Sequence, residues 1–379
     1  MHNVSVGSLG IPDAVLASAR QTADGIERSA AHLGGAVDVD ADEILTGRAG
    51  LLGLAPAGRV SAGGATRLLS TRDGWCALTL SRIDDVEAVP ALLELAEQPT
   101  DPWAALRAAA AGRGADEFVA RARMLDLPAA VLGETLPAAP RSVPNGHRAQ
   151  RRLSDLLVAD LSSMWAGPLC GHLLAGAGAI VVKVESRNRP DGTRGGDQRF
   201  FDWMNASKLS YAVDLRDDGL RPLLEAADVV IEGSRPSALT RRGLGPEQVP
   251  GRAGRVWLRV TGYGTEGECA DRAAFGDDAA VAGGLVGAGV VFVGDAIADP
   301  LTGLAATQAV LDSLARGGGE TVETALAEVA AVYATSPPIV SPRTVEPPRV
   351  PAPPSKPAAR LGADNQRVRE LIETRLGPC

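Results

Sequence analysis

The sequence predicts an α/β protein, in which a parallel Rossmann-like sheet is combined with a second, smaller α+β domain. Strand-like apolar runs alternate with helical segments between residues 153 and 334, which is the pattern of a parallel sheet covered by helices. A strand pair and several helical patterns occupy residues 1–136. Between these two parts, residues 137–152 are rich in proline, arginine and small residues, as interdomain linkers are.

The first domain is expected to open with helix, because apolar residues recur at helical spacing between residues 11 and 33. A hairpin follows, since TRLLST (66–71) and WCALTLS (75–81) flank Arg72-Asp73-Gly74, where glycine accepts the positive φ of a tight turn. Further helices are predicted over residues 89–97, 103–111 and 115–125.

In the second domain, strands and helices are expected in turn. The predicted strands are RLSDLLVADLS (152–162), AIVVKVE (179–185), DVVIEG (228–233) and RVWLRVTGYG (255–264). The predicted helices are GPLCGHLLAGAG (167–178), LRPLLEAA (220–227) and PLTGLAATQAVLDSLARG (300–317). Residues 335–379 form a last part, in which a proline-rich extended arm leads into a helix over residues 364–376.

Charge and composition exclude several classes of function. The net charge of −8 argues against nucleic acid as the main partner, because phosphate binding needs a basic field. The four cysteines are scattered without metal-ligand spacing, so we expect no metal, no disulfide framework and a reducing, cytoplasmic location. The first residues do not resemble a secretory leader, and the longest apolar stretch, residues 279–294, is too short for a membrane span.

Carboxylates are the expected source of acid–base or nucleophilic chemistry. The four histidines are dispersed and no HExxH or GxSxG motif occurs. Glu185 ends a strand as the ribose-binding acid of dehydrogenases does, yet no GxGxxG turn precedes it. Without those glycines the backbone lacks a close approach to a pyrophosphate, which argues against NAD.

A set of ordered motifs is similar to the family III (CaiB/BaiF) CoA-transferases. ADLSSMWAGPLCGHLLAGAGAIVVKVES, DGTRGG and FFDWMNASKLSYAVDL resemble the opening of that family, and ADVVIEGSRPSALTRRGLG, RVWLRVTGYG and IADPLTG continue the resemblance in order. The first 136 residues are similar to the family's second, smaller domain, which normally follows the core. The resemblance therefore implies a circular permutation, with the family's glycine loop reduced to Ala62-Gly63-Gly64.

The resemblance implies a CoA-transferase whose nucleophile is Asp299, in IADPLTG. An aspartate before Pro300 at a helix start is also typical of an N-cap, and the two roles are compatible. The helix N-terminus is expected to keep the carboxylate anionic, as attack on a thioester requires. The related 2-methylacyl-CoA racemases carry a histidine where this chain has Phe275. Asp277 and Asp278 could replace that base, although helix-start acids that face solvent are the alternative interpretation.

The same resemblance implies acyl-CoA and a carboxylate acceptor as substrates, coenzyme A as the carried group, and a homodimer. By family position, six residues are predicted to bind CoA: Met164, Trp165, Arg194, Lys208, Val213 and Arg241. Trp165 could stack on adenine or pack in the core, and the three cations could be ordinary surface residues. Ser186 and Gly233 depart from the family pattern at CoA contacts. A CoA-binding homologue without catalytic activity is therefore the non-enzymatic alternative.

Overall fold

The computed structural model of the chain describes residues 9–214, 218–334 and 348–377. Its main feature is a seven-stranded sheet with the order β4-β10-β9-β8-β5-β6-β7, in which six strands are parallel and β4 is antiparallel to β10. The strands are β4 (Arg141–Pro144), β5 (Leu157–Asp160), β6 (Ile180–Glu185), β7 (Leu209–Ala212), β8 (Val229–Glu232), β9 (Val256–Thr261) and β10 (Glu320–Ala325). The predicted α/β fold with a parallel, Rossmann-like sheet is confirmed.

The chain order of the parallel strands creates a switch point beside β5. The chain winds outward from β5 to β6 and β7, and then returns to build β8, β9 and β10 on the other side. In doubly wound sheets of this kind, ligands bind beyond the carboxyl ends of the strands at the switch point. The loops that follow β5, β6 and β8 are therefore where a ligand is expected.

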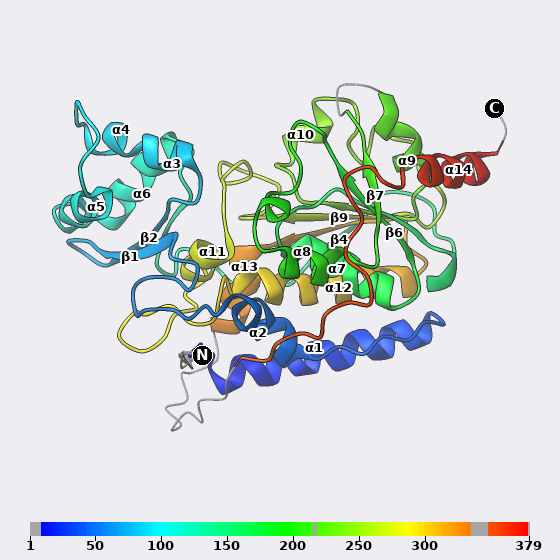
Figure 1. Ribbon diagram of the computed structural model, residues 1–379, viewed down its shortest axis with the longest axis horizontal. Coiled ribbons are helices and arrows are strands. Elements are labelled where there is room, and N and C mark those ends of the chain that lie inside the picture. Colours follow the sequence, from blue (N-terminus) through cyan, green and yellow to red (C-terminus); the bar gives the residue numbers. More distant parts are fainter. Residues whose placement is uncertain (1–8, 215–217, 335–347, 378–379) are drawn as a thin grey trace.

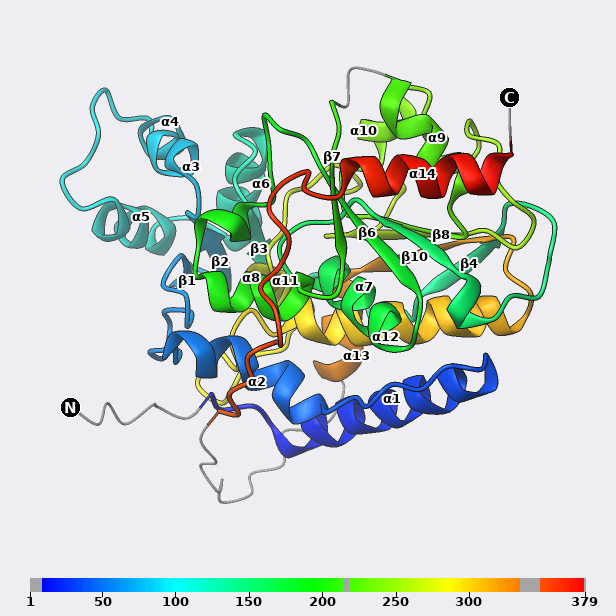
Figure 2. The ribbon, with the colours of Figure 1, turned by 45° about the vertical axis from the view of Figure 1, so that its right-hand side comes forward.

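Helices cover both faces of this sheet, and one face carries an additional helix layer (Figure 2). In that figure α14 lies on one side of the sheet, and α7 and α12 lie on the other side with α1 beyond them. The helices of this part are α1 (Asp13–His32), α2 (Ala41–Leu52), α7 (Ala166–Gly176), α8 (Gln198–Asn205), α9 (Arg221–Ala226), α10 (Ser237–Thr240), α11 (Gly276–Ala282), α12 (Ala298–Ala315), α13 (Leu326–Ala334) and α14 (Asn365–Leu376).

The smaller part of the molecule is built on an antiparallel sheet of three strands (Figure 1). Both faces of this sheet are covered, and successive residues point to opposite faces: Leu69 and Leu78 face the helices, whereas Leu68 and Ala77 face Val281 of α11. The elements are β1 (Thr66–Ser70), β2 (Trp75–Thr79), β3 (Ala129–Val131), α3 (Ile83–Glu87), α4 (Val89–Leu93), α5 (Pro102–Ala111) and α6 (Ala115–Met124). The predicted hairpin is thus present.

Two features differ from the expected division into parts. Helices α1 and α2 share the hydrophobic core of the large sheet, because α1 lays Val15, Ala19 and Ile26 against α12. They therefore pack with the large unit, although the sequence placed them in a domain spanning residues 1–136. Residues 141–144, inside the predicted linker, form the edge strand β4. All four of its residues are exposed, so no apolar run marked it as a strand.

The C-terminal segment seals the opposite edge of the sheet. The predicted proline-rich arm falls partly on residues 335–347, which lie outside the described residues. From residue 348 the chain runs in an extended path to α14. At its end, Asn365 accepts a hydrogen bond from the Ala212 amide and donates one to the Ala212 carbonyl, both at 2.9 Å. The Asp364 carboxylate accepts from the Ser210 amide at 2.8 Å, so the free backbone groups of β7 are satisfied.

Candidate functional site

Asp299 lies at the beginning of α12, at the carboxyl edge of the large sheet. The helix leads into β10 and runs antiparallel to the strands, which places its first turn at that edge. Ile297 occupies the N-cap position, Asp299 is the second helical residue and Pro300 the third. The alternative prediction that Asp299 is the N-cap is therefore wrong, because the helix begins at Ala298, two residues before the predicted start at Pro300.

Three further aspartates gather around Asp299. Asp277 and Asp278 come from the first turn of α11, and Asp295 precedes α12. Asp278 and Asp295 are fully buried, whereas Asp277 and Asp299 keep some exposed surface. The interpretation as an acid that faces solvent is wrong for Asp278, because α11 packs between the small sheet and α13 and buries this residue, whereas Asp277 is partly exposed.

Hydrogen bonds hold this cluster to the turn before α12. The Gly276 amide donates to the Asp299 carboxylate. A β-carbon at position 276 would lie 2.5 Å from Asp299 Oδ2 and 2.3 Å from the Ala296 carbonyl oxygen, so this close approach requires glycine. Asp277 Oδ1 accepts from the Ala296 amide at 3.0 Å. Ala296 has a φ of 45°, a conformation that non-glycine residues rarely adopt.

The small unit closes over the cluster through hydroxyl groups. Thr79 Oγ1 on β2 donates to Asp278 Oδ1 at 2.9 Å, and the same oxygen accepts from the Phe275 amide at 3.0 Å. The Ser61 hydroxyl donates to Asp277, and Ser61 immediately precedes Ala62-Gly63-Gly64. The reduced glycine loop is thus anchored at the edge of the aspartate cluster.

Burial raises the acid pKa values in this cluster. It raises the pKa of Asp299 to about 7, and the nearby Asp277 and Asp295 carboxylates act in the same direction. Burial likewise raises the pKa of Asp277 to about 6 and that of Asp278 to about 7. The expectation that the helix N-terminus keeps Asp299 fully anionic at neutral pH is therefore wrong. Desolvation and like charges outweigh the dipole of the helix.

One arginine, Arg48 of α2, offsets part of this negative charge. Its Nη1 forms an ion pair with Asp295 Oδ1 at 2.6 Å, and its charge lowers the pKa values of Asp277, Asp295 and Asp299. The guanidinium also lies over the ring of Trp165, 5.7 Å from its centroid. Sequence reasoning missed Arg48, because an arginine on an amphipathic helix is indistinguishable from a solvent-facing residue until its packing is known.

The loop after β5 carries Met164 and Trp165, two of the residues predicted to bind CoA. Met164 is 42% exposed and has a φ of 72°, a strained conformation of the kind that clusters at functional sites. Trp165 is 2% exposed and meets Phe200 edge to face, at 5.3 Å between ring centroids. Trp165 thus packs in the core, which was one of its two predicted roles.

The predicted cations differ in how available they are. The Arg194 guanidinium is bound by Glu185, at 2.7 Å between Nη2 and Oε2, and lies over the Phe201 ring. Lys208 is fully buried and pairs with Asp160 at 2.8 Å. A buried ammonium with its own counter-ion cannot contact a phosphate without breaking that pair, which speaks against Lys208 as a CoA ligand.

Arg241 and Val213 complete the predicted set. Arg241, just after α10, is exposed and its guanidinium bonds only to the Ser237 hydroxyl among the described residues. Val213 follows β7, is 7% exposed, and donates its amide to the Glu185 carbonyl at 3.0 Å. Met164, Arg194 and Val213 therefore lie at the carboxyl ends of β5, β6 and β7, beside the switch point. Arg241 follows β8 in the chain, and β8 is on the other side of the switch point from β6 and β7.

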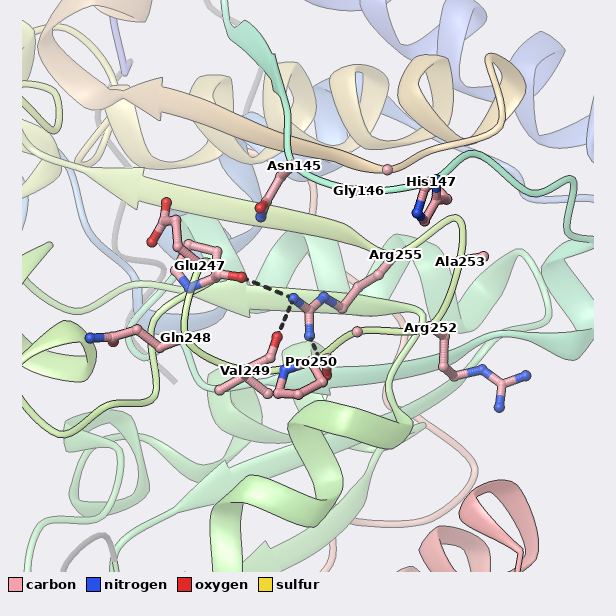
Figure 3. Close-up of a pocket in the computed structure, with 13 residues that line it drawn as sticks. Asn145, Gly146, His147, Glu247, Gln248, Val249, Pro250, Arg252, Ala253 and Arg255 are labelled. Carbon is pink, nitrogen blue, oxygen red and sulfur yellow. Dashed lines mark hydrogen bonds between the residues drawn. The ribbon is translucent and has the colours of Figure 1, made fainter.

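A hollow of about 320 Å³ lies at the opposite, amino end of the strands (Figure 3). It is lined by residues 145–147, by the loop 246–253, and by Arg255 and Gly319. The Arg255 guanidinium donates to the carbonyls of Pro246, Val249 and Pro250 at 3.1, 2.9 and 3.2 Å. These hydrogen bonds hold the loop in place. Because the hollow lies at the amino ends of the strands, it is remote from the aspartate cluster at their carboxyl ends.

Within residues 9–214, 218–334 and 348–377, no group of three or more His, Cys, Asp or Glu side chains is arranged to hold a metal. No helix in that part of the chain combines the length and the apolar character that crossing a bilayer demands.

Comparison with known proteins identifies relatives for the second half of the chain. The family model for CoA-transferase family III matches residues 153–358. The chain is 30% identical over 209 residues to succinyl-CoA–D-citramalate CoA-transferase of Chloroflexus aurantiacus, covering 48% of this chain and 51% of that protein. It is 31% identical over 180 residues to human succinyl-CoA:glutarate CoA-transferase, covering 43% and 41%.

A similar solved structure is that of a hypothetical protein from Mycobacterium tuberculosis. It shares 28% sequence identity with this chain at a TM-score of 0.45, over 49% of this chain and 57% of the other. The chain spans about half the length of the curated relatives it matches.

Proposed function

Since the chain belongs to CoA-transferase family III, we propose that it transfers CoA from an acyl-CoA to a carboxylate acceptor through a covalent intermediate on Asp299. One observation carries the assignment to this residue. Asp299 is a partly exposed residue at the carboxyl edge of the sheet, and its carboxyl group accepts from the Gly276 amide. The other aspartates of the cluster are fully buried or hold the turn before α12.

The proposed reaction exchanges one acyl bond at a time. The Asp299 carboxylate attacks the thioester carbonyl, the C–S bond breaks, and a mixed anhydride and the CoA thiolate form. The thiolate attacks the aspartyl carbonyl and expels the donor carboxylate, which leaves an aspartyl-CoA thioester. The acceptor carboxylate displaces the thiolate to form a second anhydride. Attack of the thiolate on the acceptor's acyl carbon then releases the new acyl-CoA and free Asp299.

For the CoA moiety, we propose binding across the loops that follow β5 and β6. Met164 presents an exposed thioether there, and Arg194 could share its guanidinium between Glu185 and a phosphate. Arg241 is an exposed cation available to a phosphate from the far side of the switch point. We do not assign Lys208 and Trp165 as direct CoA ligands, because Lys208 pairs with Asp160 and Trp165 packs against Phe200 in the core.

The donor class is proposed from the relatives. Both curated relatives described above are named for succinyl-CoA, so succinyl-CoA is the first donor to assay. We also propose a homodimer, which the resemblance to the family implies, and a cytoplasmic location, which the scattered cysteines favour. Light scattering of the purified protein after size-exclusion chromatography tests the first of these.

A second candidate function, racemisation of 2-methylacyl-CoA, gains support from one observation. Asp277 and Asp278 are acids of raised pKa beside Asp299, where a second base would be needed. Both are engaged, however. Asp277 accepts from the Ala296 amide and Asp278 from Thr79 and Phe275, so their oxygens hold the turn and the seam between the two units. Transfer is therefore preferred.

Trapping the intermediate tests the proposed function. Wild-type protein incubated with succinyl-CoA and then hydroxylamine is expected to carry a hydroxamate on the peptide containing Asp299, identified by mass spectrometry. Asp299→Ala should lose the adduct and all transfer activity while calorimetry still detects CoA binding. Binding of CoA by the wild type without adduct or transfer would identify a non-catalytic CoA-binding homologue instead, and full turnover by Asp299→Ala would reject this nucleophile.

A further inference from the structure

Arg48 is fixed in an unusual setting for a cation. It extends from α2, and its Nη1 contacts Asp295 at 2.6 Å, where the Asp295 side chain has no exposed surface. The guanidinium carbon lies over the rings of Trp165 and Phe200, at 5.7 and 5.6 Å from the ring centroids. The ion pair and the two aromatic rings together hold this charge in one position.

The charges that face Asp299 come from three elements. Arg48 is contributed by α2, Asp277 by α11, and Asp295 by the turn before α12. Asp278 of α11 lies next to Asp277 and interacts electrostatically with Tyr263, which follows β9. Arg272 lies over the Tyr263 ring, but it is paired with Glu134 at 2.8 Å, which leaves Arg48 to offset the carboxylates nearest Asp299.

Resting on the proposed function, we infer that Arg48 is a positioning residue for the nucleophile: the Asp295 ion pair and the Trp165 and Phe200 rings fix its charge beside the turn that leads into Asp299, where it offsets the surrounding carboxylates. Attack on a thioester needs the carboxylate form of the aspartate. Because the pKa of Asp299 is raised to about 7, a nearby charge changes the fraction of Asp299 that is ionised at neutral pH, and with it the rate of transfer. Sequence position alone would assign Arg48 no role, since it lies about 250 residues before Asp299.

Two substitutions should act in opposite directions. Arg48→Gln removes the cation, so the low-pH limb of the transfer rate should move up by about one pH unit, which is about a tenfold loss of rate at pH 6. Asp295→Asn removes a negative neighbour of Asp299 and keeps the oxygen that contacts Arg48, so the limb should move down. Arg48→Lys preserves the charge and should stay closer to wild type than Arg48→Gln does.

A matched control is available on the same helix pair. Arg20 forms an ion pair with Asp42 of α2 at 2.7 Å on the exposed surface, away from the cluster. Arg20→Gln repeats the chemical change of Arg48→Gln and should leave the pH profile unmoved. Thermal melting of every variant verifies that the protein is folded at the pH values compared.

Titration of the Asp299 carboxyl group provides a readout that does not require turnover. In protein labelled with ¹³C at aspartate side-chain carboxyls, the signal lost in Asp299→Asn is assigned to Asp299 and followed against pH. Its midpoint should rise in Arg48→Gln and fall in Asp295→Asn. Shifts of this kind in a protein without transfer activity would reject the proposed function but support the role of Arg48. An unmoved midpoint, or shifts of the same sign in both variants, would overturn the inference.

Discussion

Thr79 donates its hydroxyl to Asp278 Oδ1 at 2.9 Å, which joins the small antiparallel sheet to the first turn of α11. Asp278 is fully buried, and its other oxygen has no hydrogen-bond partner among the described residues. An ionised carboxylate in this position is costly, and burial raises the pKa of Asp278 to about 7. The folded state therefore favours the protonated form of this acid, although the hydrogen bonds from Thr79 and Phe275 favour the ionised form.

The stability of the protein should fall as this acid ionises. Because the native pKa is raised, the folded protein retains a proton that the unfolded chain has already released above about pH 4. The resulting stability is present at low pH and is lost as the pH rises through about 7. In Asp278→Asn this loss is absent, so between pH 5 and 8 the variant should gain on the order of 2 kcal/mol relative to wild type.

Urea unfolding of both proteins across that pH range measures the effect. The comparison uses the change with pH, because the new amide also introduces a buried donor whose cost is the same at every pH. Asp84→Asn, on the exposed face of α3, is the control and should follow wild type. An equal gain in this control, or a constant difference for Asp278→Asn, would contradict the assignment.

Proton exchange separates the two candidate activities. In deuterated water, a chiral 2-methylacyl-CoA is expected to keep its Cα hydrogen, because Phe275 cannot take a proton and Asp277 and Asp278 are bound within the seam. The measurement is the mass of the recovered thioester. Rapid deuteration that disappears in Asp277→Asn would establish proton chemistry at this site and displace the transferase proposal.

Removal of the first 149 residues should abolish both folding and transfer. The truncation deletes α1, whose buried residues cover α12, together with Arg48 and the hydroxyl contacts to Asp277 and Asp278. The fragment 150–379 is expected to bind an apolar dye and to show no cooperative melting transition. A fragment that folds and transfers CoA would mean that the N-terminal part is an appendage and would reject the proposed permutation.

The elements that the sequence predicted well are those with strong periodicity or strong turn signals. The strand 179–185 and the helix 300–317 correspond to β6 and α12, and the Asp73-Gly74 turn lies in the predicted hairpin. Strand β10 was not predicted, because its sequence ETVETA contains two glutamates and lacks an apolar run. One of them, Glu323, forms an ion pair with Arg141. This segment forms a strand because β4 and β9 pair with it on either side and provide backbone hydrogen bonds.

The aspartate cluster could be predicted only in part. A motif placed Asp299 at a helix start, but its raised pKa comes from burial and from the Asp277 and Asp295 carboxylates, against the lowering effect of Arg48 of α2. Lys183 shows the same limit: it occurs in an apolar strand, and its partner Asp191, at 2.7 Å, lies in the loop beyond. Burial and charge pairing are properties of the packed molecule, so local sequence patterns do not specify them.

The hydrogen bonds between Asn365 and Ala212 bear on how the protein avoids polymerising. An open β-strand edge is a template on which a strand from another molecule can add, and such addition leads toward aggregates. Here the side chains of residues 364 and 365 take the place of that intruding strand on β7, so the chain's own last helix blocks it. By closing this edge, the segment around Asp364 and Asn365 lowers the tendency of β7 to pair with a strand from another molecule.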